Sequence, residues 1–403
     1  MLHFNGGLMI IPREMKSELL RLSKMYPVLS VTGPRQSGKT TLARETFPDY
    51  AYVSLEDPDT LGAFEDDPRT FLRAYGSHVI FDEAQRAPEL FQYLQQVVDA
   101  SEETGRFVLT GSQNFLLMDA INQSLAGRVA LLYLLPLSLQ ELEDAGLGPK
   151  NAEDWLFLGG YPRLHSVSIP PETFFSNYVQ AYVERDVRRE LGVRKVREFT
   201  TFLQLCALRT GQQLNISSLA SDCGVATNTV REWLSVLEAS GIVYLLEPLF
   251  RNRSKSLTKT PKFYFLDTGL AAYLMGIRSA DELLLSEFRG ALFETAVVAE
   301  VLKAGYALGS KPELSYWRDA KKREIDLVVR RGLKPAKAIE IKSSATYNSR
   351  IFDMLRQVAP AELGLDEKDC YVVYAGDEEL HPAGGSLVSY RKLHELVQEW
   401  FRI

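Results

Sequence analysis

Short apolar runs alternate with amphipathic helical patterns between residues 28 and 136. The apolar runs are rich in β-branched and aromatic residues, as strands are. In chain order they read VLSVTG, YAYVSL, HVIFDE, RFVLTGS and RVALLYLLP. A clear helical pattern between them is LFQYLQQVVD at residues 90–99. This alternation predicts an α/β fold in which parallel strands are joined by crossover helices.

Helical patterns replace the strands between residues 137 and 200. They are interrupted by GGYP at residues 159–162 and by SIPPET at residues 168–173. Gly and Pro interrupt regular elements. We therefore expect this segment to be a helical extension of the first domain.

Residues 215–248 have the pattern of two helices joined by a turn at Gly224. The apolar positions of the second helix recur at helical spacing, at Val230, Trp233, Leu234 and Leu237. This spacing is typical of a helix-turn-helix. The basic loop and the apolar strand KFYFLD that follow would complete a winged helix.

The pattern changes again from about residue 285. Helices are expected over residues 289–304 and near residues 349–358, and the predicted strands are LSYWRD, EIDLVVRR, KAIEIKSS and CYVVYAG. This mixture of strands and helices predicts an independent α/β domain at the C-terminal end.

The composition is that of a folded globular protein. Of the 403 residues, 46% are hydrophobic and 24% are charged, which excludes disordered and fibrous classes. The net charge of -6 argues against wholesale electrostatic wrapping of nucleic acid but leaves room for local basic surfaces. The three cysteines, Cys206, Cys223 and Cys370, lack metal-ligand spacing, so we expect buried thiols in a reducing compartment.

No stretch of the sequence has the length of a membrane span. The longest strongly apolar run, VALLYLLPL at residues 129–137, is far shorter than the roughly 20 residues that a spanning helix needs. The N-terminal residues MLHFNGGLMIIPREMK place their apolar positions ahead of their charges, which reverses the order of a secretory signal. We therefore expect no membrane partner and a cytoplasmic location.

The stretch GPRQSGKT at residues 33–40 matches the G-x-x-x-x-G-K-[ST] phosphate loop at every fixed position. An apolar strand precedes it and a helical pattern follows it, as the motif requires. The predicted nucleotide-binding residues are Gly33, Pro34, Arg35, Gln36, Ser37, Gly38, Lys39, Thr40 and Thr41. Lys39 would reach the β and γ phosphates and assist catalysis, and Thr40 would ligand Mg²⁺. We therefore expect ATP and Mg²⁺ to be the cofactors.

Two further strands would bring catalytic groups to the same edge of the sheet. The strand HVIFDE ends in Asp82, which we assign to the metal, and Glu83, which we assign as the general base. The strand RFVLTGSQN delivers four polar residues to this edge, Thr110, Ser112, Gln113 and Asn114. Of these, Ser112 and Gln113 are our candidates for sensing the γ-phosphate or positioning the water. The alternative for the two acids is a solvated acidic loop, which would be the better interpretation without the phosphate loop.

Several motifs together resemble a large prokaryotic family of AAA-type ATPases joined to a C-terminal domain of unknown function. They are GPRQSGKTT, VSLEDPD, IFDEAQRAPEL, LTGSQNF, SLAGR, GGYP and YVERDVR, and the similarity extends over nearly the whole chain. The resemblance implies an ATPase with a helical lid, a winged-helix segment and a nuclease-like C-terminal domain.

An arginine finger is a further expectation of this resemblance. In ring-forming AAA proteins it precedes the fifth strand, where SLAGR places Arg128. The equally weighted alternative is that Arg128 only fixes the start of the strand. Arg185 and Arg188 are rival candidates, although ion pairs within their own helix would explain them as well. A finger acting in trans would require a homo-oligomer.

The C-terminal strands carry a possible second site. Asp326 stands on one predicted strand, and Glu340 and Lys342 stand on the next, which resembles the D...(D/E)-x-K signature of restriction-endonuclease-like folds. Asp326 and Glu340 would hold Mg²⁺ or Mn²⁺, Lys342 would activate a water, and Glu294 on the preceding helix would add a carboxylate, for which Glu300 is a poorer match. The alternative is that these acids only happen to lie near strand ends.

A basic stretch follows the predicted helix-turn-helix. Arg251, Arg253, Lys255, Lys259 and Lys262 fall within twelve residues that contain no acid. Residues near the start of the second helix are suited to groove contacts, namely Thr227, Asn228, Thr229 and Arg231. These features predict DNA binding, most directly by Arg231, Arg251, Arg253, Lys255 and Lys259. The alternatives are protein contacts by the winged helix and a merely solvated loop.

These patterns divide the chain into a P-loop ATPase core at residues 1–140, a helical lid at 141–200, a winged helix at 201–275 and a restriction-endonuclease-like α/β domain at 285–403. Our first hypothesis is a Mg²⁺-dependent ATPase coupled to DNA binding and metal-dependent DNA cleavage, in DNA processing or genome defence. A second is a nucleotide-gated switch or scaffold that recruits protein partners through an inactive nuclease-like domain. A third is a DNA-binding regulator that uses ATP only structurally.

Overall fold

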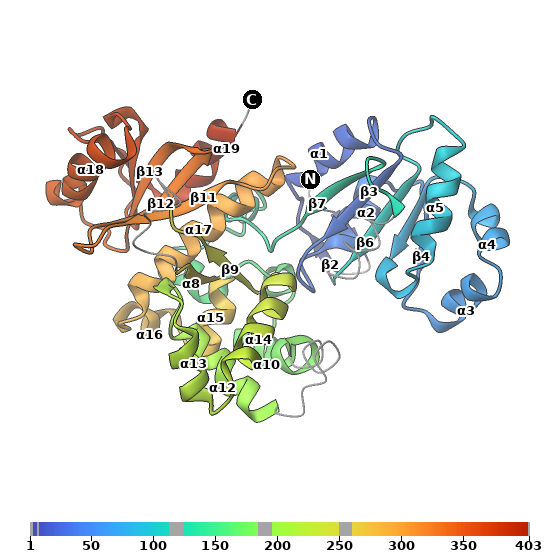
Figure 1. Ribbon diagram of the computed structural model, residues 1–403, viewed down its shortest axis with the longest axis horizontal. Coiled ribbons are helices and arrows are strands. Elements are labelled where there is room, and N and C mark those ends of the chain that lie inside the picture. The colour runs from blue at the N-terminus through green and yellow to red at the C-terminus, as the bar shows by residue number, and fades with distance from the viewer. Residues whose placement is uncertain (1–2, 6–7, 113–123, 184–195, 250–259, 402–403) are drawn as a thin grey trace.

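The computed structural model describes residues 3–5, 8–112, 124–183, 196–249 and 260–401. In Figure 1 the N-terminal part of the chain, coloured blue to cyan, forms one lobe, and the orange and red C-terminal part forms another. Green and yellow helices from the middle of the chain lie below and between them.

The N-terminal lobe is built on a five-stranded parallel sheet. Its strands are β3 (Val28–Thr32), β4 (Ala51–Ser54), β5 (Val79–Asp82), β6 (Phe107–Gly111) and β7 (Val129–Tyr133). They lie in the order β4-β5-β6-β3-β7, and each neighbouring pair is parallel. The α/β fold with a parallel sheet that the apolar runs predicted is therefore confirmed.

Helices cover both faces of this sheet and explain its apolar strands. They are α1 (Met15–Ser23), α2 (Lys39–Thr46), α3 (Pro58–Asp66), α4 (Pro68–Tyr75) and α5 (Leu90–Asp99). Every residue of β3 and β6 is buried. Strands buried on both faces read as continuous apolar runs rather than as an alternating pattern. A hairpin of β1 (His3–Asn5) and β2 (Leu8–Ile10) precedes this lobe.

Short helices follow β7, as the breaks at residues 159–162 and 168–173 predicted. They are α7 (Leu139–Asp144), α8 (Ala152–Leu158), α9 (Pro162–Ser166) and α10 (Pro171–Tyr178), and a π-helical turn spans Val179–Val183. Helix α7 begins with a capping box, in which the side chains of Ser138 and Glu141 each accept a backbone N–H of the other residue.

The middle of the chain combines helices with a three-stranded antiparallel sheet. Its elements are α12 (Val196–Ala207), β8 (Gln212–Gln213), α13 (Ile216–Cys223), α14 (Thr227–Ala239), β9 (Val243–Leu246) and β10 (Lys262–Phe265), and the strand order is β8-β10-β9. The two helices predicted around Gly224 are present, and Gly224 adopts a left-handed conformation with φ of 66°. Trp233 packs edge-on against Phe199, at 5.2 Å between ring centroids. It is a core residue of this segment.

Two short helices, α15 (Thr268–Met275) and α16 (Ala280–Leu285), lead into the C-terminal α/β unit. That unit contains α17 (Arg289–Ala307), β11 (Leu314–Arg318), β12 (Glu324–Arg331), β13 (Lys334–Lys342), α18 (Asp353–Val358), β14 (Cys370–Tyr374), β15 (Ser386–Ser389) and α19 (Leu393–Phe401). Its sheet has the order β11-β12-β13-β14-β15, antiparallel up to β13 and parallel from β13 to β15.

Single-turn 3₁₀ helices stand at Ala84–Arg86, Ser349–Phe352, Glu367–Asp369 and Tyr390–Lys392, and a second π-helical turn stands at Ala359–Leu363. One cluster of buried apolar residues runs from Leu135 to Trp400 and joins the short helices, the middle segment and the C-terminal unit. Trp155 of α8, for example, stacks on Tyr390 at 5.2 Å between ring centroids. The three cysteines are buried and unpaired, as predicted. Among the described residues, no helix is both long and apolar enough to cross a bilayer.

Candidate functional site

The phosphate loop connects β3 to α2 at the carboxyl end of the parallel sheet. Gly33 has φ of 144°, and a Cβ atom there would lie 2.2 Å from the carbonyl oxygen of Leu134, so no side chain fits. Gly38 caps α2 in a left-handed conformation with φ of 94°. The two glycines of the motif are therefore required by the backbone. The loop lies at the N-terminus of α2, where the helix dipole favours anions.

Lys39 is folded back onto its own loop. Its ammonium donates to the carbonyl oxygens of Pro34 at 2.8 Å and Gly33 at 3.1 Å. Burial lowers the pKa of Lys39 to about 8, and the charge of Glu83 opposes that shift. A buried ammonium is stabilised by an anionic partner. A nucleotide phosphate at the loop would supply one.

Asp82 lies opposite the first turn of α2. Thr40 Oγ1 donates to Asp82 Oδ1 at 2.9 Å, Tyr52 donates to Asp82 Oδ2 at 2.7 Å, and the hydroxyl of Thr110 also donates to Oδ1. Two oxygens that bind one octahedral Mg²⁺ ion at about 2.1 Å lie roughly 3 Å apart. Thr40 and Asp82 therefore fit a shared magnesium ion, as their assignment from the sequence requires.

Glu83 follows Asp82 at the end of β5 and has a left-handed backbone with φ of 54°. Its Oε2 atom accepts from the amide of Gln85 and from Ser112 Oγ, the latter at 3.2 Å. The side chain of Glu83 is thereby held at the carboxyl edge of the sheet. The structure joins Ser112, a predicted sensor, to the predicted base. Gln113 lies outside the described residues.

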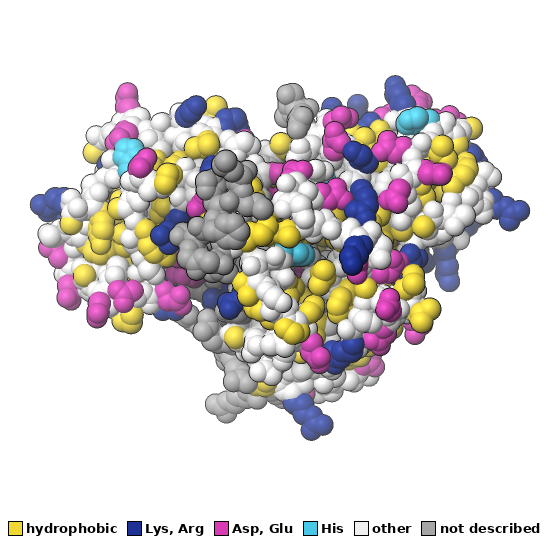
Figure 2. Space-filling model, turned by 180° about the vertical axis from the view of Figure 1, so that it is seen from behind, with side chains coloured by type: hydrophobic (Ala, Val, Ile, Leu, Met, Phe, Trp, Pro, Cys, Tyr) yellow, Lys and Arg dark blue, Asp and Glu magenta, His cyan; other side chains and the backbone are white. Residues whose placement is uncertain are grey.

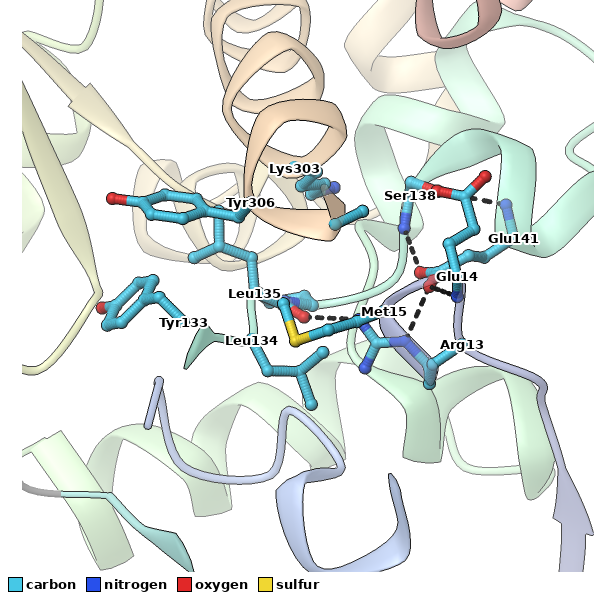
Figure 3. A pocket seen from close by; sticks show the side chains of 12 residues that line it. Arg13, Glu14, Met15, Tyr133, Leu134, Leu135, Ser138, Glu141, Lys303 and Tyr306 are labelled. Carbon is cyan, nitrogen blue, oxygen red and sulfur yellow. Dashed lines mark hydrogen bonds and ion pairs between the residues drawn. The ribbon is translucent and has the colours of Figure 1, made fainter. Parts of the chain in front are cut away.

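Arg13 holds the phosphate loop from the N-terminal side. Its guanidinium donates to the carbonyl oxygens of Ser37 at 2.6 Å and Leu135 at 2.7 Å, and to Glu141 Oε1 at 2.9 Å. Figure 3 shows the contacts of Arg13 with Leu135 and Glu141, and the same carboxylate accepting the backbone N–H of Glu14. Arg13 precedes Ser37 by 24 residues and lies in no recognisable motif, so its role could not be predicted from local sequence.

Two other parts of the chain also reach the loop. The hydroxyl of Tyr178 in α10 contacts the carbonyl oxygen of Arg35 at 3.5 Å. Gly241, in the turn between α14 and β9, lies against Pro34 and Tyr133. A Cβ atom on Gly241 would be 3.0 Å from Pro34 Cδ and 2.2 Å from the Tyr133 hydroxyl. The middle segment is therefore packed directly on the phosphate loop.

A buried charged network adjoins Arg13. His394 of α19 donates to Glu14 Oε2 at 2.6 Å, and its other ring nitrogen lies 3.6 Å from Glu300 Oε2, an ion-pair distance. Glu300 also accepts from Lys303 at 2.8 Å and from the N–H of Leu139 at 3.0 Å. Burial lowers the pKa of His394, but the carboxylates of Glu14 and Glu300 outweigh burial and raise it to about 10. Glu300 is thus a structural carboxylate rather than part of the C-terminal site.

Arg128 is held by a residue of its own chain. Its guanidinium makes two hydrogen bonds with the carboxylate of Asp99 at the end of α5, one of them 3.0 Å long. Arg128 precedes β7, so it lies at the amino ends of the parallel strands, whereas the phosphate loop follows the carboxyl end of β3. A role of Arg128 as an arginine finger in trans stays a prediction. The rival candidates Arg185 and Arg188 lie outside the described residues.

The C-terminal sheet brings Asp326, Glu340 and Lys342 together. Leu327 of β12 pairs with Ile339 of β13, which places Asp326 and Glu340 side by side on neighbouring strands. Lys342 Nζ lies 2.7 Å from Glu340 Oε2 and 3.9 Å from Asp326 Oδ2. Burial, and then the charge of Asp326, raise the pKa of Glu340 to about 8.

Glu294 of α17 faces the same site but is held by groups from the middle segment. Its Oε1 atom accepts from Lys262 Nζ at 2.8 Å and from the hydroxyl of Tyr264 at 2.6 Å. Burial, and then the charge of Asp326, raise the pKa of Glu294 to about 6. Within the described part of the chain, no three His, Cys, Asp or Glu side chains lie close enough together to hold a metal ion.

Two expectations for the basic stretch have different outcomes. Lys262, which the sequence pattern grouped with the basic loop, is not available to phosphates, because its side chain is 4% exposed and paired with carboxylates. Arg231 is exposed on α14, and so are Thr227 and Asn228. Arg251, Arg253, Lys255 and Lys259 lie outside the described residues.

Comparisons with known proteins agree with the geometry of the phosphate loop. A family model described as an AAA domain matches residues 25–143, and two models described as domains of unknown function (DUF8612 and DUF4143) match residues 149–281 and 289–393. Among solved structures, the Walker-type ATPase PABY2304 of Pyrococcus abyssi is similar over 66% of this chain and 96% of that chain, at 17% identity and a TM-score of 0.44.

Two curated relatives match over most of the chain. They are the uncharacterized proteins Rv2008c of Mycobacterium tuberculosis and Mb2031c of Mycobacterium bovis. Each is 31% identical over 380 residues, which cover 92% of this chain and 81% of the relative. The chain is therefore an AAA-type P-loop ATPase and belongs to the family that includes these two mycobacterial proteins.

Proposed function

We propose that the chain hydrolyses ATP with Mg²⁺ at the phosphate loop and couples the nucleotide state to DNA. In this proposal Thr40 and Asp82 hold the magnesium ion and Lys39 binds the β and γ phosphates. Glu83 accepts a proton from the attacking water, with Ser112 and Gln113 positioning it. Mg²⁺, when bound, neutralises charge that develops on the phosphate oxygens.

The hydrogen bond between Thr40 and Asp82 carries this proposal. It places two hard oxygen ligands at the N-terminus of α2, and the next residue, Glu83, is held at the same sheet edge. Phosphate release from purified protein, measured with ATP and increasing Mg²⁺, tests the proposal. Release that is independent of Mg²⁺, or absent with Mg²⁺ and DNA present, would contradict it.

DNA is the partner that the middle segment suggests. Its three helices and three-stranded antiparallel sheet have the element order of a winged helix, and the exposed residues Thr227, Asn228 and Arg231 stand near the start of the second helix of the pair. The basic residues Arg251, Arg253, Lys255 and Lys259 follow in sequence. Figure 2 shows acidic and basic side chains interspersed over one face of the molecule. We therefore propose a local DNA contact rather than a broad one.

Metal-dependent cleavage of phosphodiesters is a second candidate function, located at the C-terminal carboxylates. The supporting observation is that Lys342 contacts both Glu340 and Asp326, which is the arrangement that water activation beside a metal would use. Asp326, Glu340 and Glu294 would hold Mg²⁺ or Mn²⁺. The alternative is a scaffold in which this site is inactive and the domain recruits protein partners. A homo-oligomer with Arg128 acting in trans fits either candidate.

A further inference from the structure

Lys262 is a buried cation at the junction of two sheets. It is the first residue of β10, in the three-stranded sheet of the middle segment, yet its ammonium reaches the C-terminal unit. Lys262 Nζ lies 2.8 Å from Glu294 Oε1 and 2.5 Å from Glu324 Oε1, and 5.6 Å from the centroid of the Tyr316 ring. A lysine is rarely buried unless it is paired, so these contacts define its environment.

The carboxylates around Lys262 belong to the C-terminal site. Glu294 comes from α17, Glu324 and Asp326 from β12, and Glu340 from β13. Lys342 pairs with Glu340 and lies 3.9 Å from Asp326. The Oε1 atom of Glu340 is buried without a hydrogen-bond partner. Arg318 adds a third cation, because it pairs with Glu324 at 2.8 Å. The four carboxylates thus face two lysines and one arginine, and one buried carboxylate oxygen has no donor.

Burial of these acids requires positive charge. Burial lowers the pKa of Lys262, but the charges of Glu294, Asp326 and Glu324 outweigh burial and raise it above the ordinary value, so the ammonium stays charged. Among the described residues these acids do not form a group of three that could hold a metal ion, and Glu294 is instead paired with Lys262. The carboxylates are therefore not arranged as a preformed metal site, and the ammonium of Lys262 lies where a divalent ion would be expected.

We propose that Lys262 is the resident cation of this carboxylate site and that it competes with a divalent metal ion. The ammonium compensates the charge of Glu294 and Glu324 that a metal ion would otherwise compensate. This inference deepens the second candidate function and does not depend on hydrolysis at the phosphate loop. The C-terminal site then binds a metal ion only when the ammonium of Lys262 moves away from the carboxylates.

Withdrawal of the ammonium requires a shift between two sheets, because Lys262 belongs to a different sheet from its carboxylate partners on β12 and β13. A bridge between Pro248 and Tyr316 joins the two sheets, so such a shift must also move this bridge. Strand β9, which pairs with β10, follows the turn at Gly241 that packs on Pro34 of the phosphate loop. The turn that precedes this strand pair therefore contacts the phosphate loop, and Lys262 within the pair contacts the C-terminal carboxylates.

Binding of Mn²⁺ to the full chain without nucleotide tests the inference directly. Free Mn²⁺ is measured by electron paramagnetic resonance for the parent, Lys262→Gln and Lys262→Arg. We expect Lys262→Gln to bind Mn²⁺ at least about tenfold more tightly than the parent, because a competing charge is removed. Lys262→Arg keeps the charge and should bind as the parent does. Adding Asp326→Asn to Lys262→Gln should abolish the gain.

Lys262→Gln leaves buried carboxylates unpaired and could fail to fold. The charge-matched variant Lys262→Gln/Glu324→Gln removes one cation and one carboxylate together and keeps Glu294, Asp326 and Glu340. It should also gain Mn²⁺ affinity. Equal affinity in the parent and in this variant would overturn the inference, and so would a gain that survives Asp326→Asn. Phosphate release from ATP, measured on the same samples, reports on the proposed ATPase separately.

Discussion

The imidazole of His394 donates to Glu14 at 2.6 Å, across 380 residues of sequence. Glu14 follows Arg13, whose guanidinium holds the carbonyl oxygen of Ser37 in the phosphate loop. The last helix is thus tied to the nucleotide site through two adjacent residues. Because this link is charged and buried, it makes the docking of the C-terminal unit sensitive to pH.

We predict that the free energy of unfolding falls as pH rises from about 7 to 10. The pKa of His394 is raised to about 10 in the folded chain, whereas an unfolded histidine titrates near 6.5. The ion pair therefore contributes fully below about pH 6.5, and the contribution is lost as pH rises through 10. The expected loss is on the order of 2 kcal/mol or more. Urea midpoints at a series of pH values measure it.

His394→Gln is the matched variant for this prediction. It should be less stable than the parent at pH 7, because Glu14 and Glu300 lose their partner, and the difference should shrink toward pH 10. Comparing the two proteins cancels the titration of other groups. A difference that is constant from pH 7 to 10 would show that the imidazole is not charged in the folded chain.

Two substitutions are expected to affect ATP binding and ATP hydrolysis separately. Lys39→Ala should weaken nucleotide binding, because the phosphates lose their buried ammonium. Glu83→Gln should bind ATP normally but turn over at least about a hundredfold slower, as expected for the loss of a general base. Fluorescent-nucleotide titration and phosphate release measure the two effects. Turnover of Glu83→Gln at the parent rate would remove Glu83 from the mechanism.

Local patterns in the sequence predicted the strands of the parallel sheet and several helices, but not β15 (Ser386–Ser389) or α19 (Leu393–Phe401). Helix α5 spans Leu90–Asp99, as LFQYLQQVVD indicates, and the strands of the parallel sheet coincide with the apolar runs. Both signals lie within one segment, because burial on two faces fixes the composition of a strand. How the segments share a core was not visible, since the cluster from Leu135 to Trp400 depends on contacts between distant parts of the chain.

Only those residues of the candidate sites that belong to sequence motifs were predicted from the sequence. Asp82 and Thr40 meet as expected, but Tyr52, which also holds Asp82, was missed although it lies on the neighbouring strand β4. Because neighbouring parallel strands align their carboxyl ends, the position of Tyr52 on its strand could have indicated that it lies near Asp82. For Lys262 the pattern was misleading, because a charge next to a basic loop looks solvent-exposed until the partner carboxylates are located.

Because Gly241 of the middle segment packs on the phosphate loop, a substitution at Gly241 should change the affinity for ATP. Gly241→Ala places a Cβ atom 2.2 Å from the Tyr133 hydroxyl and 3.0 Å from Pro34 Cδ, so the turn must move off the loop. We expect ATP affinity to change by at least about fivefold, or roughly 1 kcal/mol. Gly224→Ala is the matched control, since Gly224 has φ of 66° but no atom within 4 Å of the added Cβ. Equal ATP affinities in the two variants would show that the contact of Gly241 with the phosphate loop does not affect nucleotide binding.

DNA binding is expected to depend on the basic residues after β9. Replacing Arg251, Arg253 and Lys255 together with Ala should weaken binding across sequences and reduce the slope of log K against log salt by about one unit per lost contact. The charge-matched control replaces the exposed residues Lys24, Lys150 and Lys368 instead. Fluorescence anisotropy at several salt concentrations measures both. An unchanged slope in the first variant would point to a protein partner.

DNA cleavage is the most demanding expectation, because a divalent metal ion must first replace the ammonium of Lys262 among the C-terminal carboxylates. With Mn²⁺ limiting, nicking of duplex, single-stranded or branched DNA should be fastest in Lys262→Gln, slower in the parent and slower again in Lys342→Ala, which keeps the metal but loses its water-activating group. Asp326→Ala should not nick at all, yet should hydrolyse ATP at the parent rate, because Asp326 lies in a different sheet from the phosphate loop. If neither the parent nor Lys262→Gln nicks any substrate with either metal, the C-terminal unit is a scaffold, and its carboxylates serve to anchor β10 through Lys262.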